Sequence, residues 1–288
     1  MLKGNHFFTD FQNQMYDQYG YALDKLNPSL KFWNYNKITG QREFRNVFSH
    51  HYYLEYAKRF EPIRHKVKKV LEIGVFKGHS MLLWEKYFPN ATIYGVDIDL
   101  NQKHLGNTPK DICKGKDRIK LKEFNACDSK ELSKVIDEGW FDLEEKFDII
   151  IDDGSHHPVH QVQALLLYLP MLKIDGTFVV EDVIDKANEG NRMVLNRIES
   201  IFKMYSNEND YVFEDFLKEQ YTGFRNLDSY GVCDWDKIFW TNNKIEDFKI
   251  DIIPAHKYSV MFDDVNLEGK EAEMVGTNKY KLIFMNRL

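Results

Sequence analysis

Cysteine is scarce in this sequence, and the cysteines it has are spread along the chain. There are three of them, Cys113, Cys127 and Cys233, an odd number with wide spacing. Small secreted domains held by disulfides carry many cysteines, and zinc sites place them in closely spaced pairs. We therefore expect a protein of a reducing compartment, with no disulfide framework and no zinc site of this kind.

Long hydrophobic runs are also missing. No segment approaches the roughly 20 apolar residues that cross a bilayer. The first residues, MLKGNHFFTDFQNQ, lack the apolar centre of a signal peptide. We expect a soluble, cytoplasmic protein with no membrane partner.

An excess of positive charge is absent as well. The net charge is −6 and the pI is about 6.0, which disfavours a nucleic-acid partner held by general phosphate attraction. What the chain does have is 288 residues with 43% hydrophobic and 15% aromatic content. That is enough to bury a full core, so we expect one large α/β domain with additions.

The rest of the chain is organised around residues 147–182, FDIIIDDGSHHPVHQVQALLLYLPMLKIDGTFVVED. Runs of Ile and Val without polar alternation are typical of parallel strands covered on both faces. The pattern predicts a buried strand over 147–151, a polar turn over 152–156, a helix over about 157–169 and a second buried strand over 177–180.

Acidic residues follow both of these strands. Asp152 and Asp153 follow the first strand, Glu181 and Asp182 follow the second, and His156 lies in the turn between. In an open parallel sheet, ligands bind beyond the carboxyl ends of the strands. The two strands therefore deliver carboxylates into one crevice, where they can hold a hard metal ion beside His156 as a general base.

Two assignments in this crevice stay open. Asp152 could replace Asp153, since the rotation of one residue decides which acid faces the crevice. His157 and His160 compete with His156 as the base. The proline that follows His157 favours a helix start at that point, because proline suits the first helical turn. Such a start leaves His156 in the turn beside the acids.

A glycine turn earlier in the chain, LEIGVFKGHS, indicates a second ligand site. A short apolar strand over 70–73 leads through the turn into a helix that opens at Ser80. The free N–H groups of such a helix start bind anionic or polar ligands. The spacing of Glu72, Gly74 and Gly78 is E-x-G-x-x-x-G, which matches neither the G-x-G-x-x-G of dinucleotide folds nor a P-loop. A nucleotide-binding dehydrogenase is therefore disfavoured.

Two further acids follow predicted neighbouring strands. The strand ATIYGVD ends in Asp97, which can accept hydrogen bonds from both ribose hydroxyls of a nucleoside, with Asp99 as the alternative. A third strand over 119–125 precedes Asp128. Asp128 could pair with an adenine amino group or cap the helix predicted over 129–138, and both roles can hold together.

The remaining segments flank this domain. Residues 1–66 are aromatic and polar, and we interpret them as a helical extension that ends in an amphipathic helix over 47–60. Residues 185–250 are rich in aromatics and acids and predict a helical insert that acts as a lid or a subunit contact. Two strands, over 257–262 and 280–286, are expected to close the sheet as an antiparallel pair.

The motifs LEIGVFKGHS, YGVDID, FDIIIDDGSHH and GTFVVEDV together resemble the class I S-adenosylmethionine-dependent methyltransferases. More narrowly, they resemble the metal-dependent sugar O-methyltransferases of macrolide tailoring, of the mycinamicin type, and relatives encoded with bacterial surface-polysaccharide genes. The resemblance covers about residues 45–184. The pairing of IDDGSH with VED is fairly specific, whereas E-x-G-x-x-x-G marks only the superfamily.

The resemblance implies a fold and a division of the chain. The expected fold is α/β, with a Rossmann-like, doubly wound, mostly parallel seven-stranded sheet. The methyltransferase domain then spans 67–288, with the N-terminal helical extension before it and the helical insert before the last two strands.

The resemblance also implies ligands and their residues. S-adenosylmethionine lies over Gly74, Gly78 and Asp97, and Mg²⁺ or another divalent cation is held by Asp153, Glu181 and Asp182, with His156 as the base. We assign the whole donor site to Glu72, Gly74, Gly78, Ser80, Asp97, Asp128 and Asp152.

The acceptor that this resemblance implies is a hydroxyl of a sugar or sugar nucleotide, in capsule polysaccharide or natural-product biosynthesis. The protein could form a homo-oligomer. Two alternatives remain: a different acceptor with the same donor (a phosphate derivative, an amine or a small phenol), or a non-catalytic binding protein that keeps the fold.

Overall fold

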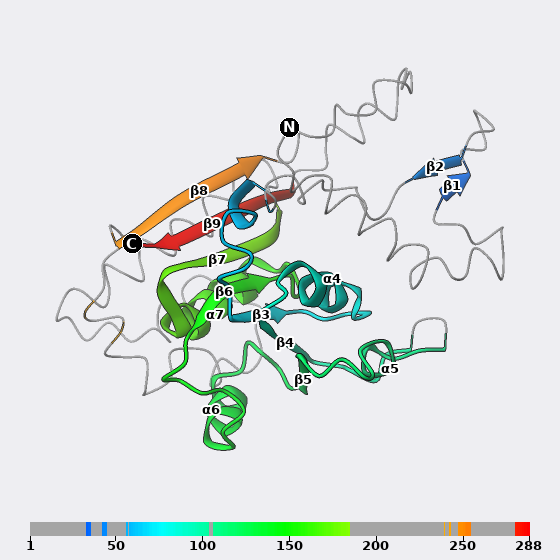
Figure 1. Ribbon diagram of the computed structural model, residues 1–288, viewed down its shortest axis with the longest axis horizontal. Helices are drawn as coiled ribbons and strands as arrows, with labels where there is room; N and C mark the ends of the chain where they lie inside the picture. Colours follow the sequence, from blue (N-terminus) through cyan, green and yellow to red (C-terminus); the bar gives the residue numbers. More distant parts are fainter. Residues whose placement is uncertain are drawn as a thin grey trace.

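The computed structural model describes the centre of the chain and parts of its flanks. The described residues are 33–35, 42–44, 56, 58–103, 106–184, 239, 242, 247–254 and 280–288. They form a seven-stranded sheet with helices on both faces, and a separate two-stranded pair (Figure 1). None of the helices in these ranges is long and apolar enough to cross a membrane.

The large sheet has the strand order β5-β4-β3-β6-β7-β9-β8. Strands β3 to β7 run parallel, and β9 is antiparallel to both of its neighbours, β7 and β8. The expected mostly parallel, doubly wound, seven-stranded sheet is confirmed. The chain changes direction across the sheet between β3 and β6, which makes a topological switch point there. The strands are β3 Lys69–Ile73, β4 Thr92–Asp97, β5 Ile119–Glu123, β6 Phe147–Asp152, β7 Leu172–Ile184, β8 Phe248–Pro254 and β9 Tyr280–Arg287.

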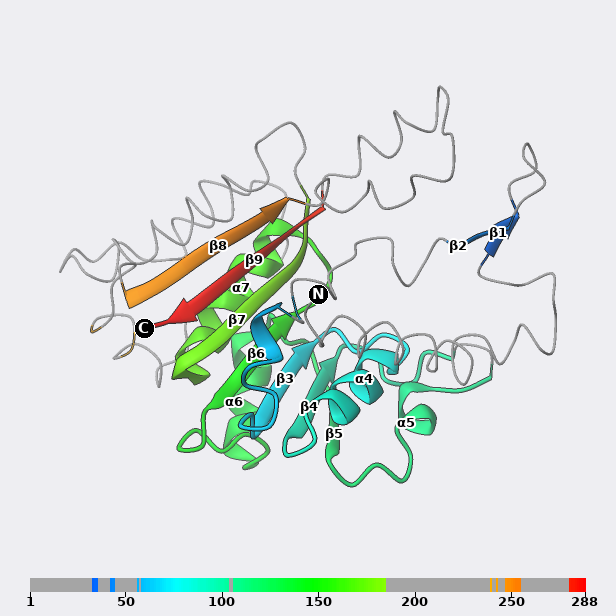
Figure 2. The same cartoon turned by 45° about the horizontal axis from the view of Figure 1, so that its top comes forward.

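Helices cover the sheet from both sides. Figure 2 shows α4 on one face and α6 and α7 on the other, as the two buried clusters of the core also require. The helices are α4 His79–Tyr87, α5 Pro109–Ile112, α6 Ser129–Asp137 and α7 Pro158–Tyr168, followed by the 3₁₀ turn η3 Leu169–Met171.

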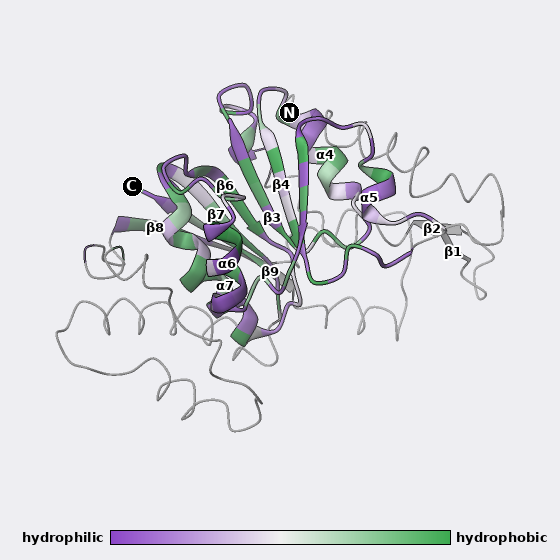
Figure 3. Ribbon diagram, turned by 90° about the horizontal axis from the view of Figure 1, so that it is seen from below, coloured by the Kyte–Doolittle hydropathy of each residue, from purple (hydrophilic) through white to green (hydrophobic). Residues whose placement is uncertain are grey.

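Strand β6 shows why the central strands are so apolar. Ile149 and Ile151 pack into the cluster that contains Trp84 of α4, whereas Ile150 packs into the cluster that contains Leu165 of α7. Successive side chains of a strand point to opposite faces, so a strand covered on both faces needs apolar residues at every position. Figure 3 shows the same contrast, with hydrophobic colouring along the central strands and hydrophilic colouring on the loops that join them.

The N-terminal extension differs from the prediction in one respect. Residues 33–35 and 42–44 form strands β1 (Trp33–Tyr35) and β2 (Arg42–Phe44), which pair antiparallel. Two short strands therefore lie within the segment for which we predicted a helical extension. Strands of three residues are too short to produce a hydrophobic alternation that sequence reading can detect. Most of the helix predicted over 47–60 lies outside the described residues, although 58–60 are helical.

The first strand of the closing pair was placed wrongly from sequence. It is β8, Phe248–Pro254, whereas the predicted 257–262 lie outside the described residues. The antiparallel pairing with β9 is confirmed. β8 lies at the edge of the sheet, and its sequence FKIDIIP alternates apolar with charged residues. This short alternation was not recognised because it directly follows a long segment rich in aromatic and acidic residues. The insert itself lies almost wholly outside the described residues, so its role as lid or subunit contact stays a prediction.

Candidate active site

The glycine turn after β3 and the acidic turn after β6 touch at the switch point. The Asp153 N–H donates to the Ile73 carbonyl at 2.9 Å, and the Gly74 N–H donates to the Val96 carbonyl at 2.8 Å. Gly74 has φ +93°, and a Cβ added to it would lie 2.1 Å from the Asp153 carbonyl oxygen. Only glycine fits there, because both the backbone angle and the close approach exclude a side chain.

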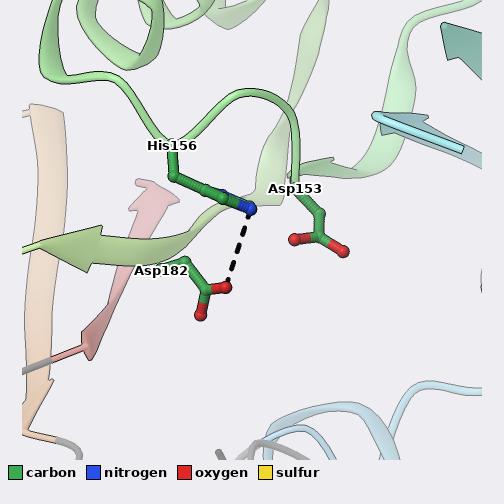
Figure 4. A group of neighbouring side chains, drawn as sticks. All are labelled: Asp153, His156 and Asp182. Carbon is green, nitrogen blue, oxygen red and sulfur yellow. Dashed lines mark ion pairs between the residues drawn. The ribbon is translucent and has the colours of Figure 1, made fainter. Parts of the chain in front are cut away.

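Three of the predicted residues come together at this edge of the sheet. Asp153 follows β6, His156 lies in the turn before α7, and Asp182 lies on β7 (Figure 4). One ligand atom of each lies within 4.8 Å of the other two, and His156 Nε2 lies 3.7 Å from Asp182 Oδ2. The structure therefore places Asp153, and not Asp152, in what we call the Asp–His–Asp group.

Two members of the Asp–His–Asp group have a strained backbone. His156 has φ +58° and Asp182 has φ +50°, in the left-handed region that residues other than glycine rarely adopt. Asp182 lies at the irregularity where the register between β7 and β9 shifts, between Val180 and Val183. Such bulges re-aim a side chain, and left-handed residues concentrate at functional sites.

The three histidines of this segment have different positions relative to α7, which begins at Pro158 as the sequence predicted. His157 is the N-cap of α7, and its Nδ1 accepts from the Val159 N–H at 3.4 Å. His160 Nδ1 lies 2.6 Å from Ser155 Oγ, and burial, with His157 nearby, lowers the pKa of His160. His156 stays in the turn beside the acids, and its Nδ1 is buried without a hydrogen-bond partner among the described residues.

Glu181 lies outside the Asp–His–Asp group. Its Oε1 accepts a hydrogen bond from the hydroxyl of Tyr56, a residue that sequence reasoning missed. The available signal was weak: Tyr56 and Phe60 are four residues apart on one face of the predicted 47–60 helix. Burial and then Asp182 raise the pKa of Glu181 to about 8, and burial and then Glu181 raise the pKa of Asp153. It is therefore unfavourable for Asp153 and Glu181 to be ionised at the same time.

The residues around the glycine turn include one buried carboxyl. Glu72 is 1% exposed, and its Oε2 has no hydrogen-bond partner among the described residues. Burial and then Glu181 raise its pKa, while a hydrogen bond with Ser80 acts in the opposite direction. Ser80 lies in the first turn of α4, whose N-cap is Gly78 at φ +82°. Glu72, Gly78 and Ser80 thus lie near the start of α4, and their role in a donor site stays a prediction.

Asp97 supports the glycine turn directly. Its Oδ2 accepts from the N–H groups of Val75 and Phe76, both at 2.8 Å, and its Oδ1 accepts from the Asp99 N–H at 3.0 Å. Asp99 accepts in turn from the Asn101 N–H at 2.9 Å, so it has the role of a turn acid. The ribose contact expected of Asp97 stays a prediction, and its support of the turn is an additional role.

Asp128 and Asp152 have different surroundings. Asp128 Oδ1 caps α6 by accepting from the N–H groups of Lys130 and Glu131, at 2.9 and 3.1 Å, so the capping role is confirmed. Asp152 is 4% exposed, and burial raises its pKa to about 7. Its Oδ1 accepts from the Gly154 N–H at 3.2 Å, and its Oδ2 has no partner among the described residues.

Part of this chain is similar to known methyltransferases. The model of a family described as "Methyltransferase domain" matches residues 71–183. The 8-demethyl-8-alpha-L-rhamnosyl tetracenomycin-C 2'-O-methyltransferase of Streptomyces olivaceus is 31% identical over 141 residues, 46% of this chain and 33% of that protein. The mycinamicin VI 2''-O-methyltransferase of Micromonospora griseorubida is 29% identical over 143 residues, 47% of this chain and 32% of that protein. The matched part thus spans about a third of the length of these relatives.

Among solved structures, the MycE methyltransferase from the mycinamycin biosynthetic pathway, in complex with Mg and SAH, has a TM-score of 0.42 at 25% identity. The match covers 55% of this chain and 44% of that one. Residues 71–183 thus match a family of methyltransferase domains, within a chain that is similar over part of its length to sugar O-methyltransferases.

Proposed function

We propose that this protein is an S-adenosylmethionine-dependent O-methyltransferase that needs a divalent cation and methylates a hydroxyl of a sugar or sugar nucleotide. The observation that carries the proposal is the Asp–His–Asp group at the switch point, in backbone contact with the glycine turn. The acceptor class is supported by relatives whose names specify O-methylation of rhamnosyl tetracenomycin compounds. The biosynthetic setting we propose is natural-product or capsule-polysaccharide assembly.

The donor site of this proposal uses the residues around the glycine turn. The buried Glu72 has an oxygen without a partner among the described residues, which suits the positively charged amino group of the donor. Asp97 already holds the turn, and its carboxylate would also accept from ribose hydroxyls. Asp128 and Asp152 would lie toward the base.

The described residues fit a divalent cation. Carboxylate oxygens are what hard cations such as Mg²⁺ prefer, and Asp153 and Asp182 offer them within 4.8 Å of each other. Burial, and then repulsion from Glu181, raises the pKa of Asp153, and a positive ion would offset that repulsion. Glu181 is the proposed third ligand. A bound cation supplies Lewis acidity, which lowers the pKa of a coordinated hydroxyl.

The chain's own residues then perform the proton transfer. His156 accepts the proton of the acceptor hydroxyl as the hydroxyl oxygen attacks the methyl carbon, and the carbon–sulfur bond breaks to release a neutral thioether. His156 Nε2 lies 3.7 Å from Asp182 Oδ2, so the imidazolium that results would form an ion pair with this carboxylate. Holding both substrates at one sheet edge supplies much of the acceleration, because the reaction becomes effectively unimolecular.

Transfer of a labelled methyl group from S-adenosylmethionine to a panel of sugar nucleotides and rhamnosides tests the proposal. We expect transfer with Mg²⁺, loss of transfer with EDTA, and a fall of about tenfold or more in Asp182→Asn. The matched control is Asp117→Asn, which makes the same change at an exposed residue. Transfer that EDTA leaves unchanged would refute the cation requirement. Transfer only to a phosphate derivative, an amine or a phenol would refute the acceptor class.

A further inference from the structure

Tyr56 connects a segment before the methyltransferase domain to the acids of the site. It precedes the matched residues 71–183, yet its hydroxyl donates to Oε1 of Glu181 on β7. The residue is 4% exposed, so this hydrogen bond is formed inside the protein. Removing a carboxylate even partly from water is costly unless a hydrogen-bond donor satisfies it, which makes the contact with the Tyr56 hydroxyl important for the half-buried Glu181.

Three aromatic rings fix the position of the Tyr56 hydroxyl. The Tyr56 ring stacks on Phe60 at 5.5 Å between centroids, and it meets Trp84 and Phe284 edge-on at 5.2 and 5.9 Å. These rings come from the segment before β3, from α4 and from β9. The Tyr56 hydroxyl is therefore held in place before any ligand binds, and little side-chain freedom is lost when it donates its hydrogen bond to Glu181.

Glu181 is adjacent in sequence to Asp182 of the Asp–His–Asp group, and its backbone is also fixed. The side chain of Gln161, from α7, donates to the Glu181 carbonyl oxygen at 2.8 Å. With the backbone held by Gln161 and one carboxylate oxygen held by Tyr56, the carboxylate has one preferred orientation. Among the described residues, none makes a hydrogen bond to its second oxygen.

We propose that Tyr56 is a positioning residue of the cation site, which orients Glu181 so that its second carboxylate oxygen can serve as a ligand beside Asp153 and Asp182. This inference rests on the proposed function, because it presupposes a divalent cation at that edge of the sheet. It adds a contribution from outside the matched domain. Residues that orient metal ligands typically change metal affinity by about 10–100-fold when they are replaced.

Binding of Mn²⁺ to the full chain, followed by electron paramagnetic resonance, tests the role without an acceptor substrate. We expect Tyr56→Phe to weaken Mn²⁺ binding by about tenfold or more. The matched control is Tyr87→Phe, because Tyr87 is also buried and its hydroxyl also donates to a carboxylate, Glu61 Oε2, at 2.9 Å. We expect the control to bind Mn²⁺ like the wild type.

The outcomes separate this inference from the proposed function. A wild type that binds no Mn²⁺ overturns the cation requirement and the positioning role together. If the wild type and the Tyr56→Phe variant bind Mn²⁺ equally well, the positioning role alone is overturned. The same holds if Tyr87→Phe weakens Mn²⁺ binding as much as Tyr56→Phe does. If Tyr56→Phe does not fold, the test uses the Tyr87→Phe variant, which lacks the Tyr87 hydroxyl paired with the Glu61 carboxylate. Its ultraviolet difference spectrum is recorded on addition of Mn²⁺. The absence of a tyrosine signal in that spectrum overturns the positioning role of Tyr56.

Discussion

Gly74 lies directly against the backbone of Asp153, at the point where a Cβ on Gly74 would be 2.1 Å from the Asp153 carbonyl oxygen. This contact joins the turn proposed to bind the methyl donor to the turn that carries the Asp–His–Asp group. The spacing between the donor and the proposed cation is therefore set by the backbone of two neighbouring strands, β3 and β6. A rigid element of this kind suits a reaction that depends on how two substrates are placed.

Replacing Gly74 by alanine tests this contact. We expect Gly74→Ala to lower the free energy of unfolding by about 2–4 kcal/mol, because it adds overpacking to the cost of a left-handed backbone. Urea denaturation measures the change. Gly115→Ala is the control, since Gly115 has φ +78° but no heavy atom within 4 Å of its Cβ position, and we expect a loss of about 1 kcal/mol. Equal losses in the two variants would contradict the contact.

The capping role of Asp128 has its own test. Asp128→Ala removes the acceptor for the first N–H groups of α6, and we expect it to lower the free energy of unfolding by about 1 kcal/mol. Asp128→Asn keeps a capping oxygen and should unfold like the wild type in thermal denaturation. Equal destabilisation by both changes would argue against the cap.

His156 and His157 can be compared by the same substitution. Asparagine tolerates the left-handed backbone of His156, so His156→Asn should keep the fold while removing the base. We expect initial rates of methyl transfer to fall by about 10²–10⁴-fold, with the affinity for S-adenosylhomocysteine unchanged. His157→Asn keeps an N-cap acceptor and should keep the rate. A similar fall in rate for both variants would remove His156 from its proposed role.

The reactivity of Cys113 follows from its burial. Its thiol contacts the Gly78 carbonyl at 3.8 Å, and burial raises the pKa of Cys113 to about 12. Burial also raises the pKa of Cys127. At pH 9 a thiol of pKa 12 is only about 0.1% thiolate, the reactive form. In a Cys233→Ser variant we therefore expect slow reaction with a disulfide reagent at pH 7–9 and fast reaction in urea. Fast reaction of the folded protein at pH 8 would contradict this.

The central parallel strands and the start of α7 could be predicted because their signals are local. Strand β6 contains three consecutive isoleucines, since both of its faces are covered, and the proline after His157 indicated the helix start. The gathering of acidic residues at one edge of the sheet could also be predicted, because the carboxyl ends of parallel strands lie at the same edge.

Other features depend on contacts that sequence spacing does not contain. Tyr56 and Glu181 are 125 residues apart, and nothing in either segment indicates that they meet. The left-handed backbone at Asp182 lies at the register shift against β9, a strand about a hundred residues later. The choice of Asp153 over Asp152 likewise depended on the turn geometry.

Calorimetric titration of the wild type with S-adenosylhomocysteine, with and without Mg²⁺, tests the proposed methyl-donor site most directly. We expect saturable binding at one site. Asp97→Ala should weaken it by about tenfold or more, since Asp97 makes two charge-assisted hydrogen bonds to the glycine turn. Asp99→Ala, which removes a neighbouring turn acid, should bind like the wild type. The absence of binding to the wild type under both conditions would contradict the account.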